Sequence, residues 1–185
     1  MTSKKIFVGI DRDGTINKDL GYVTHPQDFQ PISGSLEAIA TIRKKGYGVV
    51  IISNQGGIQK SFMTTEDVDA VHDQMLNLLG KAGCPDIDGI YYSESSDKRD
   101  TYAKPNTGMF KLSQKNISDL NWKNGFYVGD QMSDLKAAVK IGARPVLVRT
   151  GYGLKTEEDL NKYTYKNIKR SAYVFDSLQA FAEEL

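Results

Sequence analysis

The sequence is poor in cysteine and histidine and carries almost no net charge. Its 185 residues include one cysteine, Cys84, and two histidines. A single cysteine excludes an internal disulfide framework and any zinc site with several thiolate ligands. The 24 basic and 23 acidic side chains leave a formal charge of +1. This balance excludes a strong overall positive field for binding nucleic acid, although it does not exclude a local basic patch.

Long apolar runs are also missing. The run near the N-terminus spans only residues 6–10, whereas a signal peptide needs roughly 7–15 apolar residues. No segment approaches the ~20 apolar residues of a transmembrane helix. The composition, with 39% hydrophobic and 25% charged residues, is typical of a globular protein that can bury a core. We therefore expect a soluble, cytoplasmic protein in which residues 1–185 form one domain.

Short apolar runs alternate with amphipathic stretches along the chain. The clearest helix is expected at residues 65–81, where apolar side chains follow the 3.6-residue period and Thr64 with Asp67 matches a capping box. The alternation predicts an α/β fold with a doubly wound, mainly parallel sheet and no large cap domain. Strands are expected at residues 6–10, 48–53, 89–92, 126–129, 145–148 and 173–175, and helices at 35–45, 65–81, 107–116, 133–141, 156–162 and 178–185.

Polar side chains follow four of these strands. Ligands of open parallel sheets bind beyond the carboxyl ends of the strands, so we expect these side chains to meet at one edge of the sheet. The set consists of Asp11 and Asp13 after the first strand, Ser53 at the second, Lys104 downstream of the third, and Asp130 and Asp134 after the fourth.

The residue types in this set indicate phosphate chemistry. Clustered carboxylates raise each other's pKa unless a cation joins them, and an acidic, all-oxygen site is typical of Mg²⁺. A lysine and a hydroxyl suit a phosphate group. One carboxylate can attack phosphorus, and another two residues away can protonate the leaving oxygen and then activate water. The structural alternative for Asp11 and Asp13 alone is an ordinary acidic turn.

Short motifs in chain order carry a family resemblance. One set consists of Asp11-x-Asp13-Gly14-Thr15, Ser53-Asn54, Lys104-Pro105 and Gly129-Asp130-x-x-x-Asp134. This set resembles the four motifs of the haloacid dehalogenase superfamily of phosphatases. Further motifs are Gly21-Tyr22-Val23, Asn54-Gln55-x-Gly57-Ile58, Ile90-Tyr91-Tyr92 and Leu147-Val148-Arg149-Thr150-Gly151. With them the chain resembles more closely the D-glycero-D-manno-heptose 1,7-bisphosphate phosphatases, with histidinol-phosphate phosphatases as the sister group, and the similarity runs from about residue 6 to residue 151.

The resemblance implies a role for each motif residue. Asp11 would be the nucleophile and a magnesium ligand, and Asp13 the general acid and base, binding metal through its backbone carbonyl. Asp130 would be the remaining carboxylate ligand, with Asp134 supporting it from behind. The transferring phosphoryl group would be held by Ser53 and Lys104. Substrate would be bound by Asp19, Leu20, Gly21, Tyr22, Asn54, Gln55, Gly56, Ala103 and Gln131.

Two departures from the heptose enzymes concern metal and specificity. Those enzymes usually carry a zinc-bound loop, but its ligand positions here are Ser93, Ser95, Asp100 and Tyr102, so we expect no structural zinc. They also carry an arginine and often a lysine at positions that are Ala103 and Gln131 here. Alanine cannot make the bidentate bonds by which arginine recognises a phosphate. Either Lys98 or Arg99 could reach into the pocket instead.

We expect a monomeric, magnesium-dependent phosphomonoester hydrolase that is independent of membranes. The loops at residues 17–34 and 93–104 should roof its site. Heptose bisphosphate is the first substrate candidate. The alternatives are histidinol phosphate, the 3′-phosphate of a nucleic-acid end, and a catalytically silent phosphate-binding protein. The near-neutral charge weakens the nucleic-acid alternative, because binding a phosphate backbone normally needs a basic stripe.

Overall fold

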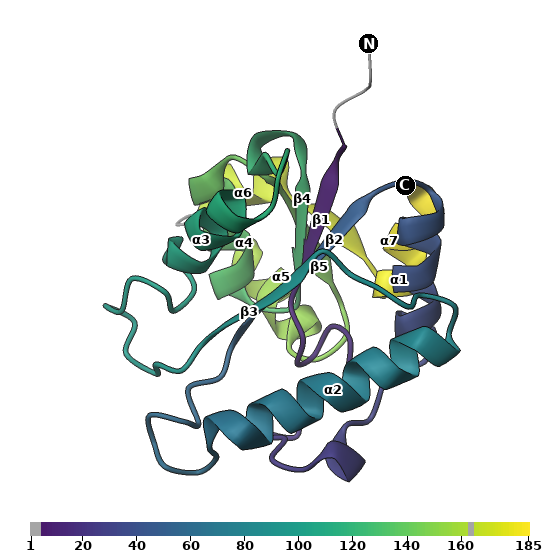
Figure 1. Ribbon diagram of the computed structural model, residues 1–185. Helices are drawn as coiled ribbons and strands as arrows, with labels where there is room; N and C mark the ends of the chain where they lie inside the picture. The colour runs from purple at the N-terminus through teal and green to yellow at the C-terminus, as the bar shows by residue number, and fades with distance from the viewer. Residues whose placement is uncertain (1–4, 163–164) are drawn as a thin grey trace.

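A six-stranded parallel sheet forms the centre of the computed structural model, which describes residues 5–162 and 165–185 (Figure 1). The strand order is β3-β2-β1-β4-β5-β6, and every neighbouring pair is parallel. The predicted α/β fold is therefore confirmed. The strands are β1 (Phe7–Ile10), β2 (Gly48–Asn54), β3 (Gly89–Ser93), β4 (Phe126–Gly129), β5 (Arg144–Val148) and β6 (Tyr173–Phe175).

The central strand β1 is where the order of the sheet reverses. β2 pairs with it on one side and β4 on the other. All four residues of β1 are buried, as a continuous apolar strand must be when helices cover both faces of a sheet. The connections diverge beyond the carboxyl end of β1, which leaves a crevice where ligands of doubly wound sheets bind.

Helices cover both faces of the sheet (Figure 1). One face is packed by α1 (Ser35–Lys44), α2 (Thr65–Lys81) and α7 (Leu178–Glu184), whose apolar side chains share one core cluster. The other face is packed by α3 (Gly108–Asn116), α4 (Met132–Ile141), α5 (Gly153–Leu160) and α6 (Lys166–Ser171). Short 3₁₀ turns lie at η1 (Pro26–Asp28) and η2 (Trp122–Asn124). Among residues 5–162 and 165–185 there is no large cap domain inserted between the strands.

The helix α2 has the bounds that its sequence pattern predicts. The Thr64 hydroxyl accepts a hydrogen bond from the Asp67 amide at 3.2 Å, and the Asp67 carboxylate accepts one from the Thr64 amide at 2.8 Å. This capping box satisfies two amide groups that the first turn leaves without helical partners. His72 lies on the buried side of α2.

The segment after β5 differs most from prediction. The helix expected at residues 156–162 begins three residues earlier, at Gly153, and ends at Leu160. Glycine is a poor helix former, so the sequence pattern does not predict a helix that begins at Gly153. A Cβ on Gly153 would collide with the carbonyl oxygen of Val148, so close packing requires glycine there. The six-residue α6 was not predicted, because Ile168 is its one partly buried apolar residue and no periodic pattern marks it.

No helix in the described part of the chain is both long and apolar enough to cross a bilayer.

Candidate active site

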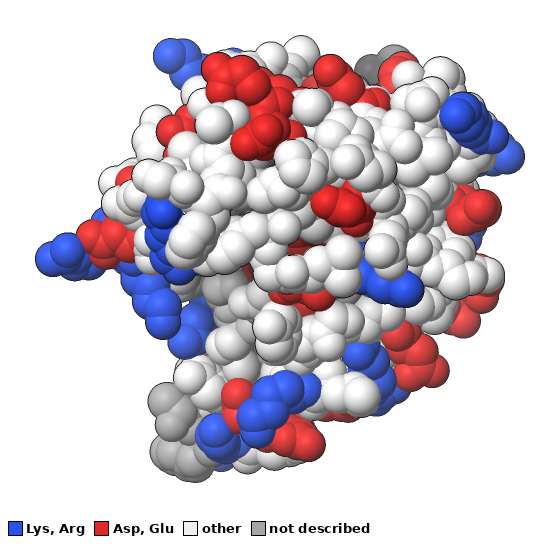
Figure 2. Space-filling view, turned by 90° about the horizontal axis from the view of Figure 1, so that it is seen from below, with Lys and Arg blue, Asp and Glu red and all other residues white. Residues whose placement is uncertain are grey.

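The carboxyl ends of β1, β2 and β4 bring the six predicted catalytic and metal-binding residues together. Asp11 follows β1, Ser53 lies near the end of β2, and Asp130 follows β4. Asp11, Ser53, Asp130 and Asp134 are all buried. Figure 2 shows this edge of the sheet, with a hollow whose left margin carries blue side chains and with red atoms recessed near the centre.

Lys104 is the hub of the cluster. Its Nζ donates to Asp11 Oδ1 and to Asp134 Oδ1, both at 2.7 Å, and lies 2.9 Å from the Tyr127 hydroxyl. Burial alone would lower the pKa of Lys104, but the two carboxylates raise it well above its usual value. The ammonium therefore stays charged, and it holds a positive charge against the carboxylate of Asp11.

Three buried carboxylates lie close together in this cluster. Asp11, Asp130 and Asp134 each offer an oxygen within 4.8 Å of the others. Burial raises the pKa of Asp11 to about 7, against the lowering effect of Lys104, and it raises the pKa of Asp130 to about 8. One ammonium does not balance three buried carboxylates, so a divalent cation would stabilise their ionised forms.

The oxygens that remain for a cation come from Asp11 and Asp130. Asp134 is engaged at both oxygens, since Oδ1 accepts from Lys104 and Oδ2 accepts from the Gln131 amide at 2.9 Å. Asp130 Oδ2 accepts from the Tyr152 amide at 2.7 Å, but its Oδ1 is buried with no hydrogen-bond partner among the described residues. Hard carboxylate oxygens in this arrangement fit Mg²⁺.

Gly14 lets the chain turn beside this cluster. Its φ is +81°, in the left-handed region that favours glycine. A Cβ at this position would also collide with the Asp130 carboxylate. The glycine after Asp13 is therefore required both for the turn and for the close approach of the segments that follow β1 and β4.

Asp13 lies beside the cluster in a separate network. Its carboxylate accepts hydrogen bonds at 2.9 Å from Arg12 Nη2, Asn17 Nδ2 and Gln55 Nε2. Burial alone would raise the pKa of Asp13, but the Arg12 charge and these bonds bring it below its usual value. Asp13 is thus ionised and fixed in orientation.

Arg12 is a site residue that the sequence reasoning missed. Its side chain is completely buried, and it bonds Asp13, Gln55 Oε1 at 3.1 Å and His72 Nε2 at 3.3 Å. Burial and the nearby guanidinium lower the pKa of His72 to about 3, so the imidazole is neutral and accepts the bond. The one signal in the sequence is an arginine between two acids directly after a buried strand.

Two of the predicted substrate-binding residues also hold catalytic residues in place. Gln55 is buried, and its amide donates to Ser53 Oγ at 2.6 Å as well as to Asp13. Asn54 bonds the backbone of Lys104 in both directions, accepting from its amide at 2.9 Å and donating to its carbonyl at 3.1 Å. These contacts align β2 with the segment that carries Lys104.

Four of the predicted substrate-binding residues, Asn54, Gly56, Ala103 and Gln131, line a cavity of about 420 Å³ that reaches Lys104. The other predicted substrate-binding residues, Asp19, Leu20, Gly21 and Tyr22, are not part of it. Asp19 lines a different cavity with Thr150, and Tyr22 packs against Phe62 with ring centroids 5.1 Å apart. Val23 and Phe29 of the loop at residues 17–34 are buried in the core with side chains of α1 and α2, whereas its first residue, Asn17, bonds Asp13 at the site.

The loop at residues 93–104 lies at the site and is held by hydrogen bonds. Gln59 Oε1 accepts from the Ser96 amide at 2.7 Å and from the Ser96 hydroxyl at 2.9 Å. Asn106 Nδ2 donates to the carbonyls of Lys98 and Asp100 at 2.9 and 2.7 Å. The four positions at which zinc ligands were considered, Ser93, Ser95, Asp100 and Tyr102, line one cavity of about 460 Å³.

Comparison with known proteins agrees with this geometry. Residues 6–176 match the family described as polynucleotide kinase 3 phosphatase. The chain is 38% identical over 162 residues to the D-glycero-beta-D-manno-heptose-1,7-bisphosphate 7-phosphatase of Photorhabdus laumondii, covering 82% of this chain and 85% of that protein. It is 33% identical over 177 residues to the protein of the same name from Pseudomonas putida, covering 95% and 97%.

A solved structure shares the whole fold. The D,D-heptose 1,7-bisphosphate phosphatase from B. bronchiseptica, complexed with magnesium and phosphate, is 30% identical with a TM-score of 0.85 over 97% of each chain. The resemblance expected from the motifs is therefore confirmed. The match over residues 6–176 and the shared fold show that the chain belongs to the polynucleotide kinase 3 phosphatase family, within the haloacid dehalogenase superfamily of phosphatases.

Proposed function

We propose that the protein is a magnesium-dependent phosphomonoester hydrolase that works through an aspartyl-phosphate on Asp11. The observation that carries this proposal is the placement of Lys104 Nζ 2.7 Å from Asp11 Oδ1, with Asp130 and Asp134 in the same buried cluster. The lysine offsets the charge of an incoming phosphoryl group, which a carboxylate nucleophile alone would repel.

In the first step, Asp11 attacks phosphorus in line with the leaving oxygen. A bond forms between the carboxylate oxygen and phosphorus, the ester bond to the leaving group breaks, and Asp13 delivers a proton to the leaving oxygen. A phosphoryl dianion beside Asp13 raises the pKa of its carboxyl, which favours the protonated form that this step needs. Ser53 and Lys104 hold the phosphoryl oxygens.

In the second step, water cleaves the aspartyl-phosphate. Asp13 takes a proton from the water, whose oxygen bonds to phosphorus while the bond to Asp11 breaks. Arg12, Asn17 and Gln55 suit Asp13 to this role, since their bonds to its carboxylate keep it ionised and oriented.

Mg²⁺ fits the oxygens that the site leaves free. We assign its protein ligands to the carboxylates of Asp11 and Asp130 and to the backbone carbonyl of Asp13. When bound, the ion would neutralise negative charge on the reacting phosphoryl group. Asp134 supports the site indirectly, because both of its oxygens are taken by Lys104 and the start of α4.

The proposed substrate is a phosphorylated sugar, with D-glycero-D-manno-heptose 1,7-bisphosphate first. Relatives named for this activity match at 33–38% identity over most of their length. Histidinol phosphate and a 3′-phosphorylated oligonucleotide are the comparison substrates for an assay with purified protein and Mg²⁺.

The test of the mechanism is Asp11→Asn. We expect hydrolysis of 4-nitrophenyl phosphate to fall at least ~10³-fold, on the order of the loss when a nucleophile is removed, while circular dichroism and the melting transition show a folded protein. Asp73→Asn, an exposed acid on α2, is the matched control. Activity of Asp11→Asn close to the wild-type value would refute the proposed nucleophile.

A further inference from the structure

The charged side chains that line the cavity beside Lys104 are all positive. The volume of this cavity is about 420 Å³, within the range of small-molecule sites. Lys98, Lys104 and Lys136 line it, and none of its lining residues is acidic. Lys104 lies at the end of the cavity next to the catalytic cluster, because its Nζ bonds Asp11. A ligand that fills the cavity from this end would carry negative charge beyond the reacting phosphoryl group.

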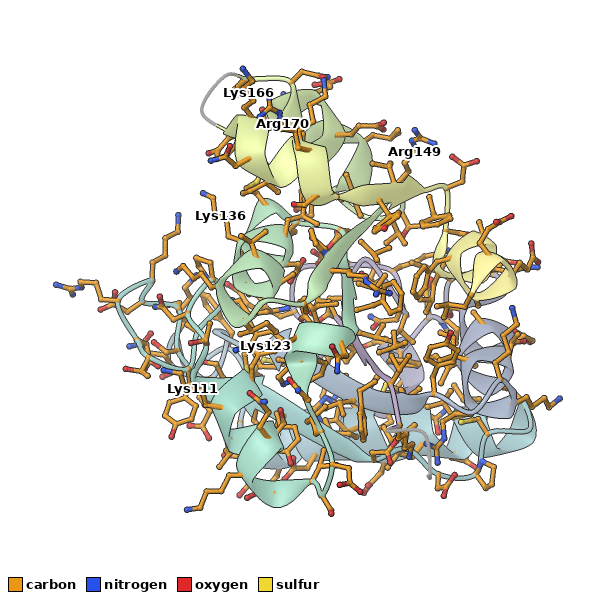
Figure 3. The ribbon with its side chains drawn as sticks, turned by 90° about the horizontal axis from the view of Figure 1, so that it is seen from above. Lys111, Lys123, Lys136, Arg149, Lys166 and Arg170 are labelled. Carbon is orange, nitrogen blue, oxygen red and sulfur yellow. The ribbon has the colours of Figure 1, made fainter. Side chains whose placement is uncertain are left out.

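The two outer lysines come from different elements. Lys98 belongs to the loop at residues 93–104, and Lys136, which is labelled in Figure 3, belongs to α4. Lys136 Nζ lies 4.8 Å from the centre of the Tyr165 ring, which places the half-buried lysine by a cation–π contact. Within residues 5–162 and 165–185, neither lysine forms an ion pair with a carboxylate.

Short side chains form part of the remaining lining, together with Pro105, Met132 and Tyr165. Ser133 supplies a hydroxyl group, the hydroxyls of Ser95 and Ser96 donate to Gln59 Oε1 and keep lone pairs that can accept, and the buried Ala103 occupies little space. Hydroxyl groups suit the oxygens of a sugar, whereas an ammonium is a compact point charge that suits a phosphate. The cavity therefore combines a neutral polar wall with two ammonium groups set apart from Lys104.

We propose that Lys98 and Lys136 bind a second phosphate group of the substrate, the one that is not cleaved, while the serines face the sugar. This inference rests on the proposed function. Ala103 and Gln131 stand where the resembling enzymes carry positive side chains. In this proposal Lys98 and Lys136 supply two positive charges to the same cavity from other positions.

The test compares two ligands that differ by one phosphate, D-glycero-D-manno-heptose 1,7-bisphosphate and D-glycero-D-manno-heptose 7-phosphate. Apparent affinity is measured as KM or, for a ligand that is not turned over, as inhibition of 4-nitrophenyl phosphate hydrolysis. We expect the wild type to bind the bisphosphate at least tenfold more tightly. Lys98→Gln and Lys136→Gln should each weaken bisphosphate binding roughly tenfold, as expected for a lost charged hydrogen bond, with less than twofold change for 4-nitrophenyl phosphate.

Controls separate this inference from the phosphatase proposal. Lys136→Arg should retain most of the bisphosphate preference, and Lys111→Gln, an exposed lysine on α3, should retain all of it. Equal losses for both ligands, or no loss with the bisphosphate, would overturn the second-phosphate site while leaving aryl phosphate hydrolysis intact. A loss confined to a 3′-phosphorylated oligonucleotide would also overturn it, in favour of a polymer ligand. Failure of the wild type to hydrolyse any phosphate ester would instead refute the proposed function.

Discussion

At the scale of single residues, two buried cations organise the site. Lys104 joins Asp11 to Asp134, and Arg12 joins Asp13 to Gln55 and His72. The two cations affect the acids that they contact in different ways. Lys104 offsets part of the negative charge of the cluster that receives phosphate, whereas Arg12 keeps Asp13 ionised and oriented. Asp11 and Asp13 therefore differ in pKa because their buried surroundings and partner cations differ, although both are aspartates.

Arg12→Lys tests the second of these pairings. Lysine keeps the charge but loses the planar fork that reaches several acceptors at once. We expect kcat/KM for 4-nitrophenyl phosphate to fall about tenfold, because a misplaced catalytic group costs rate. The acidic limb of the pH profile of kcat should move to higher pH, because the second step needs ionised Asp13 and the pKa of Asp13 rises toward its usual value. The control is Arg43→Lys, whose arginine pairs with Asp86 and Asp88 away from the site. An unchanged pH profile would mean that Arg12 has only a structural role.

At the scale of elements, the loop at residues 93–104 supplies side chains to the cavity in which we propose that the substrate binds. It carries Lys98 and Ala103 to the cavity, and Gln59 and Asn106 hold it in place. Hydrogen bonds from neutral side chains and backbone groups thus help to order this loop. Each such bond contributes only about 1 kcal/mol, so several are needed to order a loop.

Gln59→Ala should loosen this loop without unfolding the sheet. We expect faster amide hydrogen exchange at Ser96, whose amide donates to Gln59, and a KM for the preferred sugar phosphate raised by a factor of about 3–10, equivalent to roughly one hydrogen bond. Gln114→Ala, an exposed glutamine on α3, is the control. Unchanged exchange at Ser96 would show that the loop is ordered by other contacts.

At the scale of the whole molecule, the catalytic cluster acts against folding stability in the absence of a cation. The pKa values of Asp11 and Asp130 are raised from 3.8 to about 7 and about 8, so the folded state binds more protons than the unfolded state between these limits. Stability from this source therefore falls as pH rises from about 4 to about 8, by at most about 1.4 kcal/mol per pH unit for each group.

Magnesium should reverse this loss. We expect the melting temperature in EDTA to be lower at about pH 8.5 than at about pH 6.5, and added Mg²⁺ to raise it more at the higher pH, where protons no longer compete for the carboxylates. Asp130→Asn should flatten the pH dependence and remove most of the Mg²⁺ effect. Equal Mg²⁺ shifts in Asp130→Asn and the wild type, measured by scanning calorimetry, would place the ion elsewhere.

Much of this architecture could be predicted from the sequence. Alternating buried strands and amphipathic helices determined the parallel sheet, and α2, β4 and β6 have the predicted bounds. The motif residues at the strand ends were found because parallel strands share one carboxyl edge, so chain order fixes which side chains meet. The single cysteine by itself excluded a zinc site with several thiolate ligands.

Only the tertiary structure decided what those residues contact. The burial of Arg12, the support given by Gln55 and the two occupied oxygens of Asp134 depend on contacts between segments 43 to 60 residues apart, or on a local turn, and no periodic pattern encodes them. The path of the loop at residues 17–34 was decided in the same way, because Val23 and Phe29 are buried in the core while Asn17 bonds Asp13 at the site. The strand pattern sets where a segment ends, but the energy of packing that segment against distant ones determines which of its side chains reach the site.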